Sequence, residues 1–202
     1  MNWNMPIILA STSPRRQSLL EESRWQVEVM PPTVDDGCLS PGQASPEEWV
    51  EALAWLKARS VLDLLQESRH PKEACTVLGA DTICLDGGRL LGQPVDEADA
   101  RKMLQGFMEG SHDVLTGACL VAFPEGHRLI FHDRASVRWG TVSRENVDEY
   151  MVSGHWQGKA GGYNLIERID AGWPIECKGD PATVMGLPMR RLRELLGTGV
   201  QA

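Results

Sequence analysis

Strand-like and helix-like segments alternate along the chain, and this alternation limits its possible folds more than any other feature of the sequence. Apolar runs that predict strands cover residues 6–10, 26–30, 76–85, 114–123 and 128–139. Signals for the start of a helix occur near residues 14, 46, 96, 143 and 188. Such alternation favours an α/β fold in which helices flank a twisted sheet.

The connection between the last two predicted strands indicates that this sheet is mixed. Only Pro-Glu-Gly-His separates residues 114–123 from 128–139, so the two runs predict an antiparallel hairpin. The length of 202 residues suits one sizeable α/β domain or two small lobes. No internal repeat or long linker is visible, and we expect a single domain over residues 1–202.

The charge balance restricts the partners that the protein can have. A formal net charge of −8 argues against nucleic acid or an anionic membrane as a partner of the general surface. A polyanionic ligand must therefore be held by a local basic cluster. No apolar run approaches about 18 residues, and the N-terminal residues lack the pattern of a signal peptide, so we expect a cytoplasmic protein. The five cysteines are scattered, which predicts reduced thiols, although their number leaves room for one disulfide.

An unusual helix start follows the first predicted strand. Ser13 is expected to be the N-cap and Pro14 the first helical residue. Arg15 and Arg16 come next, at the positive end of the helix dipole, where each cation is unfavourable by about 0.3–1 kcal/mol. A bound anion would offset both charges, so the pair indicates an anion site.

Lys57 lies within the apolar stripe of the helix that is predicted from residue 46 to about residue 67. The residues assigned to this stripe are Val50, Leu53, Ala54, Val61 and Leu64. A lysine there can bury its stem while its ammonium reaches water. Alternatively, its ammonium points into a cleft, toward an anion.

Asp81 interrupts the apolar run 76–85, where a carboxylate is costly to bury unless it is paired or holds a metal. It could cap a turn at a strand bulge. It could also lie at a strand end, where it would coordinate Mg²⁺ or orient an attacking water. Asp35 or Asp36 could supply a further metal-binding carboxylate, or both could belong to a solvated acidic loop.

Lys159 lies among Gly158, Gly161 and Gly162, in a loop that exposes backbone N–H groups. Such a loop can approach phosphate oxygens, but an ordinary glycine-rich turn explains the same residues equally well. Together, the paired arginines, the stripe lysine, the strand aspartate and this loop fit a polyphosphate held beside a metal-binding carboxylate.

Several segments, in order, resemble the motifs of the Maf family of nucleoside triphosphate pyrophosphatases. They are LASTSPRRQSLL, LAWLKA, GADTICLDGGRLLGQPVDEADARKML, HDVLTG, VDEYMVSGHWQGKAGGY and VMGLPM, and they span nearly the whole chain. The resemblance implies a fold like that of the inosine triphosphate pyrophosphatases, with a cleft between two lobes. It also implies hydrolysis of a nucleoside triphosphate between the α and β phosphates, which gives the monophosphate and pyrophosphate.

The resemblance also implies roles for individual residues. Asp81 matches the acidic proton acceptor, and with Asp36 it is a candidate ligand for Mg²⁺ or Mn²⁺. The implied substrate-binding residues are Ser11, Arg15, Arg16, Lys57, Thr82 and Lys159. The positions that set base choice in the branch acting on dTTP and UTP are Arg15, Thr82 and Ile166. The first two of these agree with that branch. A homodimer is the family expectation.

Two residues depart from the family pattern. Gln93 stands where a phosphate-binding lysine is usual, and Ile166 stands where a base-reading glutamine is usual. Loss of one charged hydrogen bond to phosphate would cost about 1.5–3 kcal/mol, enough to slow an enzyme without abolishing turnover. Two alternatives are therefore kept beside a dTTP/UTP pyrophosphatase. One is a housecleaning enzyme acting on modified triphosphates, and the other is a nucleotide-binding regulatory module with little or no turnover.

Overall fold

Seven strands pair into one mixed sheet in the computed structural model, which describes residues 3, 6–34, 37–67 and 73–197. The strands are β1 (Ile7–Ala10), β2 (Val27–Val29), β3 (Cys75–Asp86), β4 (Arg89–Leu91), β5 (Ser111–Phe123), β6 (Arg128–Trp139) and β7 (Ile175–Lys178). Their order is β2-β1-β3-β5-β6-β7, with β4 paired to β3. β1 is parallel to β2 and β3, whereas β4 and β7 are antiparallel to their partners. The predicted mixed α/β sheet is confirmed.

Among the described residues, helices occur within one residue of all five predicted starts, and also at three short segments without a predicted start. They are α1 (Pro14–Glu21), α2 (Pro46–Glu67), α3 (Glu97–Phe107), α4 (Arg144–Ser153), η1 (Ala160–Gly162), α5 (Leu165–Asp170), α6 (Pro181–Met185) and α7 (Met189–Leu196). The capping box at the start of α2 is confirmed, since Ser45 Oγ accepts from the N–H of Glu48 and the Glu48 carboxylate accepts from the N–H of Ser45. β4, β7, η1, α5 and α6 were not predicted, because each is too short to show a period.

The chain forms two compact units. The first contains Met1–Asp81, Thr116–Asp133 and Gly186–Ala202, and the second contains Thr82–Leu115 and Arg134–Met185. The long strands β3, β5 and β6 contribute one part to each unit. The single domain over residues 1–202, and the cleft expected within it, stay predictions.

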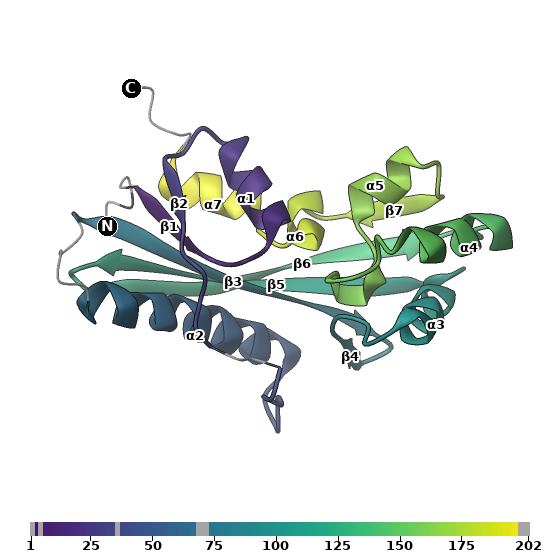
Figure 1. Cartoon of the computed structure of the whole chain (residues 1–202), viewed down its shortest axis with the longest axis horizontal. Coiled ribbons are helices and arrows are strands. Elements are labelled where there is room, and N and C mark those ends of the chain that lie inside the picture. The colour runs from purple at the N-terminus through teal and green to yellow at the C-terminus, as the bar shows by residue number, and fades with distance from the viewer. Residues whose placement is uncertain (1–2, 4–5, 35–36, 68–72, 198–202) are drawn as a thin grey trace. The chain divides into compact units, whose positions relative to one another are not determined.

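In the first unit, α2 lies along one face of the sheet, and α1 and α7 lie on the other side (Figure 1). The core beneath α2 is formed by Ile8, Ala10, Ala54, Ala58, Val61, Leu62, Leu65, Cys75, Val77, Cys119, Val121 and Phe123. The predicted stripe was displaced by part of a turn, because α2 meets the sheet along its alanines. Leu64 is 39% exposed as a result, and Lys57 lies at the border of the buried face.

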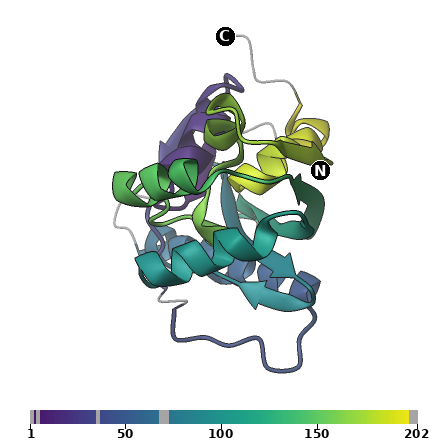
Figure 2. The same cartoon turned by 90° about the vertical axis from the view of Figure 1, so that its right-hand side faces the viewer.

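In the second unit, α3 and α4 pack against each other, and both face the viewer in Figure 2. Arg101 of α3 forms an ion pair with Asp148 of α4. The core of this unit is rich in rings that meet edge to face or stack, namely Phe107, His112, Trp139, Tyr150, Tyr163 and Trp173. The ring packing stabilises this unit beyond its buried area.

His112 is buried within this aromatic core and lowers the acid stability of the fold. Its Nε2 lies 2.8 Å from the hydroxyl of Tyr163, whereas its Nδ1 is buried with no hydrogen-bond partner among the described residues. Burial lowers the pKa of His112 to about 4, because an imidazolium would be poorly solvated there. The folded state therefore binds this proton less readily than the unfolded chain does.

We expect the free energy of unfolding to fall as the pH decreases from about 6.5 to about 4, by about 3 kcal/mol in total from His112 alone. Denaturant unfolding at several pH values in this window, for the wild type and His112→Gln, measures the effect. The variant should show the shallower dependence on pH, because carboxylate protonation remains common to both proteins. Equal slopes would contradict the prediction.

The cysteines are free thiols, as predicted: Cys38, Cys75, Cys84, Cys119 and Cys177. Burial raises the pKa of Cys84 and of Cys119 to about 12, which keeps both protonated. Among the described residues, no helix is long and apolar enough to cross a membrane.

Candidate active site

The turn between β1 and α1 is built around Ser11 in the first unit. β1 and β3 are parallel, and Ala10 opposite Gly79 is their last residue pair. Ser11 and Asp81 both lie just past this pair, at the carboxyl end of β1. Ser11 is buried, and its Oγ accepts hydrogen bonds from the N–H of Ser13 at 3.1 Å and from Arg16 Nη1 at 3.3 Å. Ser13 occupies the predicted N-cap position, but its own side chain makes no capping bond.

Arg16 forms hydrogen bonds with two different segments of the first unit. Its Nε donates to the carbonyl of Gly186 at 2.9 Å, while its Nη1 reaches Ser11. Arg15 is half-buried beside it, and the first turn of α1 contains no acidic residue. This leaves the positive end of α1 reinforced by guanidinium groups, as the sequence predicted. The sequence did not indicate Gly186 as a partner, because every residue has a main-chain carbonyl and its position depends on the fold.

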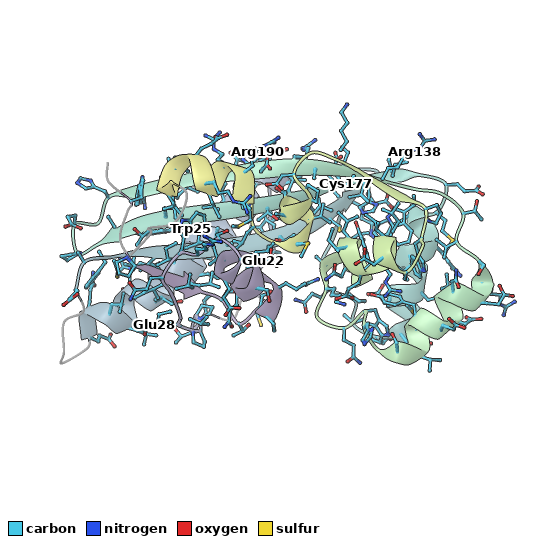
Figure 3. The ribbon with its side chains drawn as sticks, turned by 90° about the horizontal axis from the view of Figure 1, so that it is seen from above. Glu22, Trp25, Glu28, Arg138, Cys177 and Arg190 are labelled. Carbon is cyan, nitrogen blue, oxygen red and sulfur yellow. The ribbon has the colours of Figure 1, made fainter. Side chains whose placement is uncertain are left out.

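The segment after α1 is also tied to the C-terminal part of the unit. Trp25, labelled in Figure 3, donates its indole N–H to the carbonyl of Gly197 at 3.1 Å. Together with the Arg16–Gly186 bond, this contact connects both ends of α1 to the segment that contains α7.

Lys57 and Asp81 form a buried ion pair. Lys57 Nζ lies 2.5 Å from Asp81 Oδ1, and the two side chains are only 14% and 12% exposed. Lys57 therefore does not extend its ammonium into water. Asp81 does not lie at a strand end, since β3 continues to Asp86. It lies beyond the last residue pair of β1 and β3, because β1 ends at Ala10, opposite Gly79.

Thr82 follows Asp81 in β3 and is half-buried. Successive side chains of a strand alternate between faces, so Thr82 lies on the face opposite Asp81. It belongs to the second unit, as do Lys159 and Ile166. The structure thus brings together Ser11 with Arg16 and Lys57 with Asp81, all within the first unit.

Lys159 is engaged within the second unit. Its Nζ lies 2.8 Å from Glu167 Oε2, and its side chain is 13% exposed. Asn164 holds the other carboxylate oxygen at 2.9 Å and also caps α5 by accepting from the N–H groups of Ile166 and Glu167. Ile166 itself is 39% exposed, and Gln93 is exposed. The sequence-based prediction for Lys159 did not include Glu167 as its partner.

The described residues suit a metal ion that binds together with the substrate phosphates better than one held by protein ligands alone. They contain no group of three or more His, Cys, Asp or Glu side chains that could hold a metal ion. Mg²⁺ is commonly bound through one or two carboxylates together with substrate phosphates, and Asp81 can supply one such carboxylate. Asp36, the other predicted ligand, lies outside the described residues.

Comparison with known proteins identifies the family of the chain. The family model for Maf-like proteins matches residues 6–198. The chain is 40% identical over 190 residues to a dTTP/UTP pyrophosphatase of Symbiobacterium thermophilum, covering 94% of this chain and 92% of the relative. It is 38% identical over 191 residues to the enzyme of the same name from Bacillus cytotoxicus, covering 93% of each chain. The match to the one from Ruminiclostridium cellulolyticum is 34% over 190 residues and covers 94% of each. The chain belongs to the Maf family.

Proposed function

We propose that this protein is a nucleoside triphosphate pyrophosphatase that hydrolyses dTTP and UTP between the α and β phosphates. The observation that carries the proposal is the buried Lys57–Asp81 pair, which lies in the same unit as the cationic start of α1. Its relatives named dTTP/UTP pyrophosphatase match over more than nine-tenths of the chain, which supports the substrate class.

The proposed reaction has three requirements. A water oxygen attacks the α-phosphorus, this water loses a proton, and the negative charge on the departing pyrophosphate is stabilised. Arg15, Arg16 and the backbone N–H groups at the start of α1 supply positive charge for the phosphates. Because Ser11 and Gly186 hold the Arg16 guanidinium in place, little reorganisation is needed when the substrate binds.

Asp81 is the carboxylate assigned to the attacking water. Lys57 donates to its Oδ1 and thereby restrains the orientation of the carboxylate. In this role Asp81 accepts the proton of the water as the oxygen–phosphorus bond forms and the bond to pyrophosphate breaks. A substrate-bound Mg²⁺ would offset phosphate charge, and Asp81 is the residue that would hold it.

In this proposal, Ile166 and Glu167 at the start of α5 affect how strongly the enzyme discriminates between bases. The side chain of Ile166 has no hydrogen-bonding group, and its N–H is satisfied by Asn164 Oδ1 at 3.1 Å. The neighbouring Glu167 carboxylate is satisfied by Lys159 and Asn164. A site without a base-directed hydrogen bond discriminates weakly between bases. We therefore propose that dTTP and UTP are preferred over CTP and the purine triphosphates by a modest margin.

The test is a substrate screen with the purified protein and Mg²⁺. Release of pyrophosphate and monophosphate is measured for the canonical triphosphates and for a set of modified ones. Pyrophosphate from dTTP and UTP is the expected result. Orthophosphate with a diphosphate product would place the cleavage at the wrong bond and contradict the proposal. Measurable binding without hydrolysis of any triphosphate would favour the nucleotide-binding regulatory module instead.

A further inference from the structure

Two glycines lie where α2 approaches the sheet of the first unit. A Cβ atom on Gly79 would lie 2.2 Å from the carbonyl oxygen of Ala54 and 2.7 Å from the nitrogen of Ala58. A Cβ atom on Gly117 would lie 2.3 Å from the carbonyl oxygen of Val50. The backbone of α2 therefore lies directly against the backbone of β3 and β5, with no room for a side chain between them.

The need for glycine at these positions is spatial. Neither Gly79 nor Gly117 is among the glycines with a positive φ, so an L-residue could adopt either backbone conformation. Only the closeness of α2 excludes a larger residue. Small residues on α2 also allow the helix to lie close to the strand, since Ala54 and Ala58 are fully buried at this contact.

The contact at Gly79 is adjacent to the buried ion pair on both elements. On β3, Asp81 is two residues after Gly79 and so lies on the same face of the strand. On α2, Lys57 immediately precedes Ala58, whose nitrogen and Cβ meet Gly79. The distance between Lys57 Nζ and Asp81 Oδ1 is thus set by how closely α2 lies on β3 at this point.

We propose that Gly79 is a positioning residue for the Lys57–Asp81 pair: by lacking a side chain, it lets α2 lie flat on β3 so that the ammonium reaches the carboxylate. The effect on the pair follows from geometry alone. The effect on catalysis rests on the proposed function. Gly117 provides a matched control, because it is equally tight against α2 but meets Val50, two turns before Lys57.

The first experiment measures the coupling of the pair without any substrate. A double-mutant cycle with Lys57→Met and Asp81→Asn is followed by denaturant unfolding in the wild-type, Gly79→Ala and Gly117→Ala backgrounds. In the Gly79→Ala background, the coupling, expressed as a ratio of folding equilibrium constants, should fall at least about tenfold. In the Gly117→Ala background it should be retained, although overall stability falls in both. Retention in Gly79→Ala, or equal loss in both backgrounds, would overturn the proposal.

The second experiment measures steady-state pyrophosphate release. Gly79→Ala should lower kcat about 100-fold, because a displacement of about 1 Å in a catalytic group has this effect. KM should change by less than about threefold, since the phosphate-binding arginines lie on α1. Gly117→Ala should retain kcat within about threefold. A loss of kcat in Gly117→Ala as large as that in Gly79→Ala would overturn the proposal.

Two outcomes need separate treatment. If Gly79→Ala does not fold, Ala58→Ser, which adds one atom at the same contact, replaces it in both experiments with the same expected direction and the same contradicting results. If the wild-type protein hydrolyses no triphosphate, the proposed function fails, whereas the coupling measurement still decides whether Gly79 positions the pair.

Discussion

Asp81→Asn is expected to lower kcat for pyrophosphate release by about 1,000-fold, within the range that a positioned general base contributes. The amide keeps the size of the side chain but cannot accept the proton of the attacking water. KM should change much less, because the phosphate contacts assigned to Arg15 and Arg16 remain. Single-turnover hydrolysis with excess enzyme separates this loss in the chemical step from any effect on product release.

Asp63→Asn provides the control for this substitution. Asp63 lies on α2, the helix that contains Lys57, and forms an exposed ion pair with Arg59 at 2.6 Å. Its loss should leave kcat within about twofold, because it has no role in the proposed chemistry and exposed pairs contribute little. Undiminished release by Asp81→Asn would remove Asp81 from the mechanism, whatever the control shows.

Lys57→Met is expected to lower both stability and activity. Removal of the ammonium leaves the Asp81 carboxylate buried without its ion-pair partner, which should reduce the free energy of unfolding by about 3–5 kcal/mol. Release of pyrophosphate should fall about 100-fold, because the carboxylate is no longer held in one orientation. Denaturant unfolding and steady-state kinetics on the same preparation measure the two losses.

A double variant separates the structural and the catalytic parts of this effect. Lys57→Met combined with Asp81→Asn removes both charges, so most of the lost stability should return while the activity stays low. Arg59→Met is the matched control, since Arg59 is 51% exposed in its pair with Asp63 and its loss should cost no more than about 1 kcal/mol. A double variant as unstable as Lys57→Met would show that the pair is not the source of the instability.

Most helices and long strands could be predicted from the sequence because their signals are local. The Ser45–Glu48 capping box and the Pro-Glu-Gly-His connection each specify structure within a few residues, and both predictions are confirmed. The anion site at the arginines of α1, which the helix dipole predicts, stays a prediction. The assignments of Thr82 and Ile166 to base choice, and the homodimer, stay predictions.

The orientation of Lys57 and the environment of Asp81 could not be predicted in the same way. Helical periodicity placed Lys57 inside the apolar stripe, but it does not say which way α2 is rotated on the sheet. In the structure, α2 meets β3 at Gly79, next to the pair, where no side chain separates the two backbones. The same limit applies to Lys159, because its pairing with Glu167 depends on the turn that separates them.

The sequence by itself determined the α/β class, the family and the cationic start of α1, because these depend on local pattern and on ordered motifs. Only the tertiary structure decided that Lys57 is paired with Asp81 and that Arg16 is held by Ser11 and by the carbonyl of Gly186. The Lys57–Asp81 and Arg16–Gly186 contacts join residues 24 and 170 positions apart in the chain, and the first depends on how closely helix and sheet backbones pack. The backbones pack this closely where a glycine provides no side chain, and the pattern of residue types does not show which glycines meet a helix.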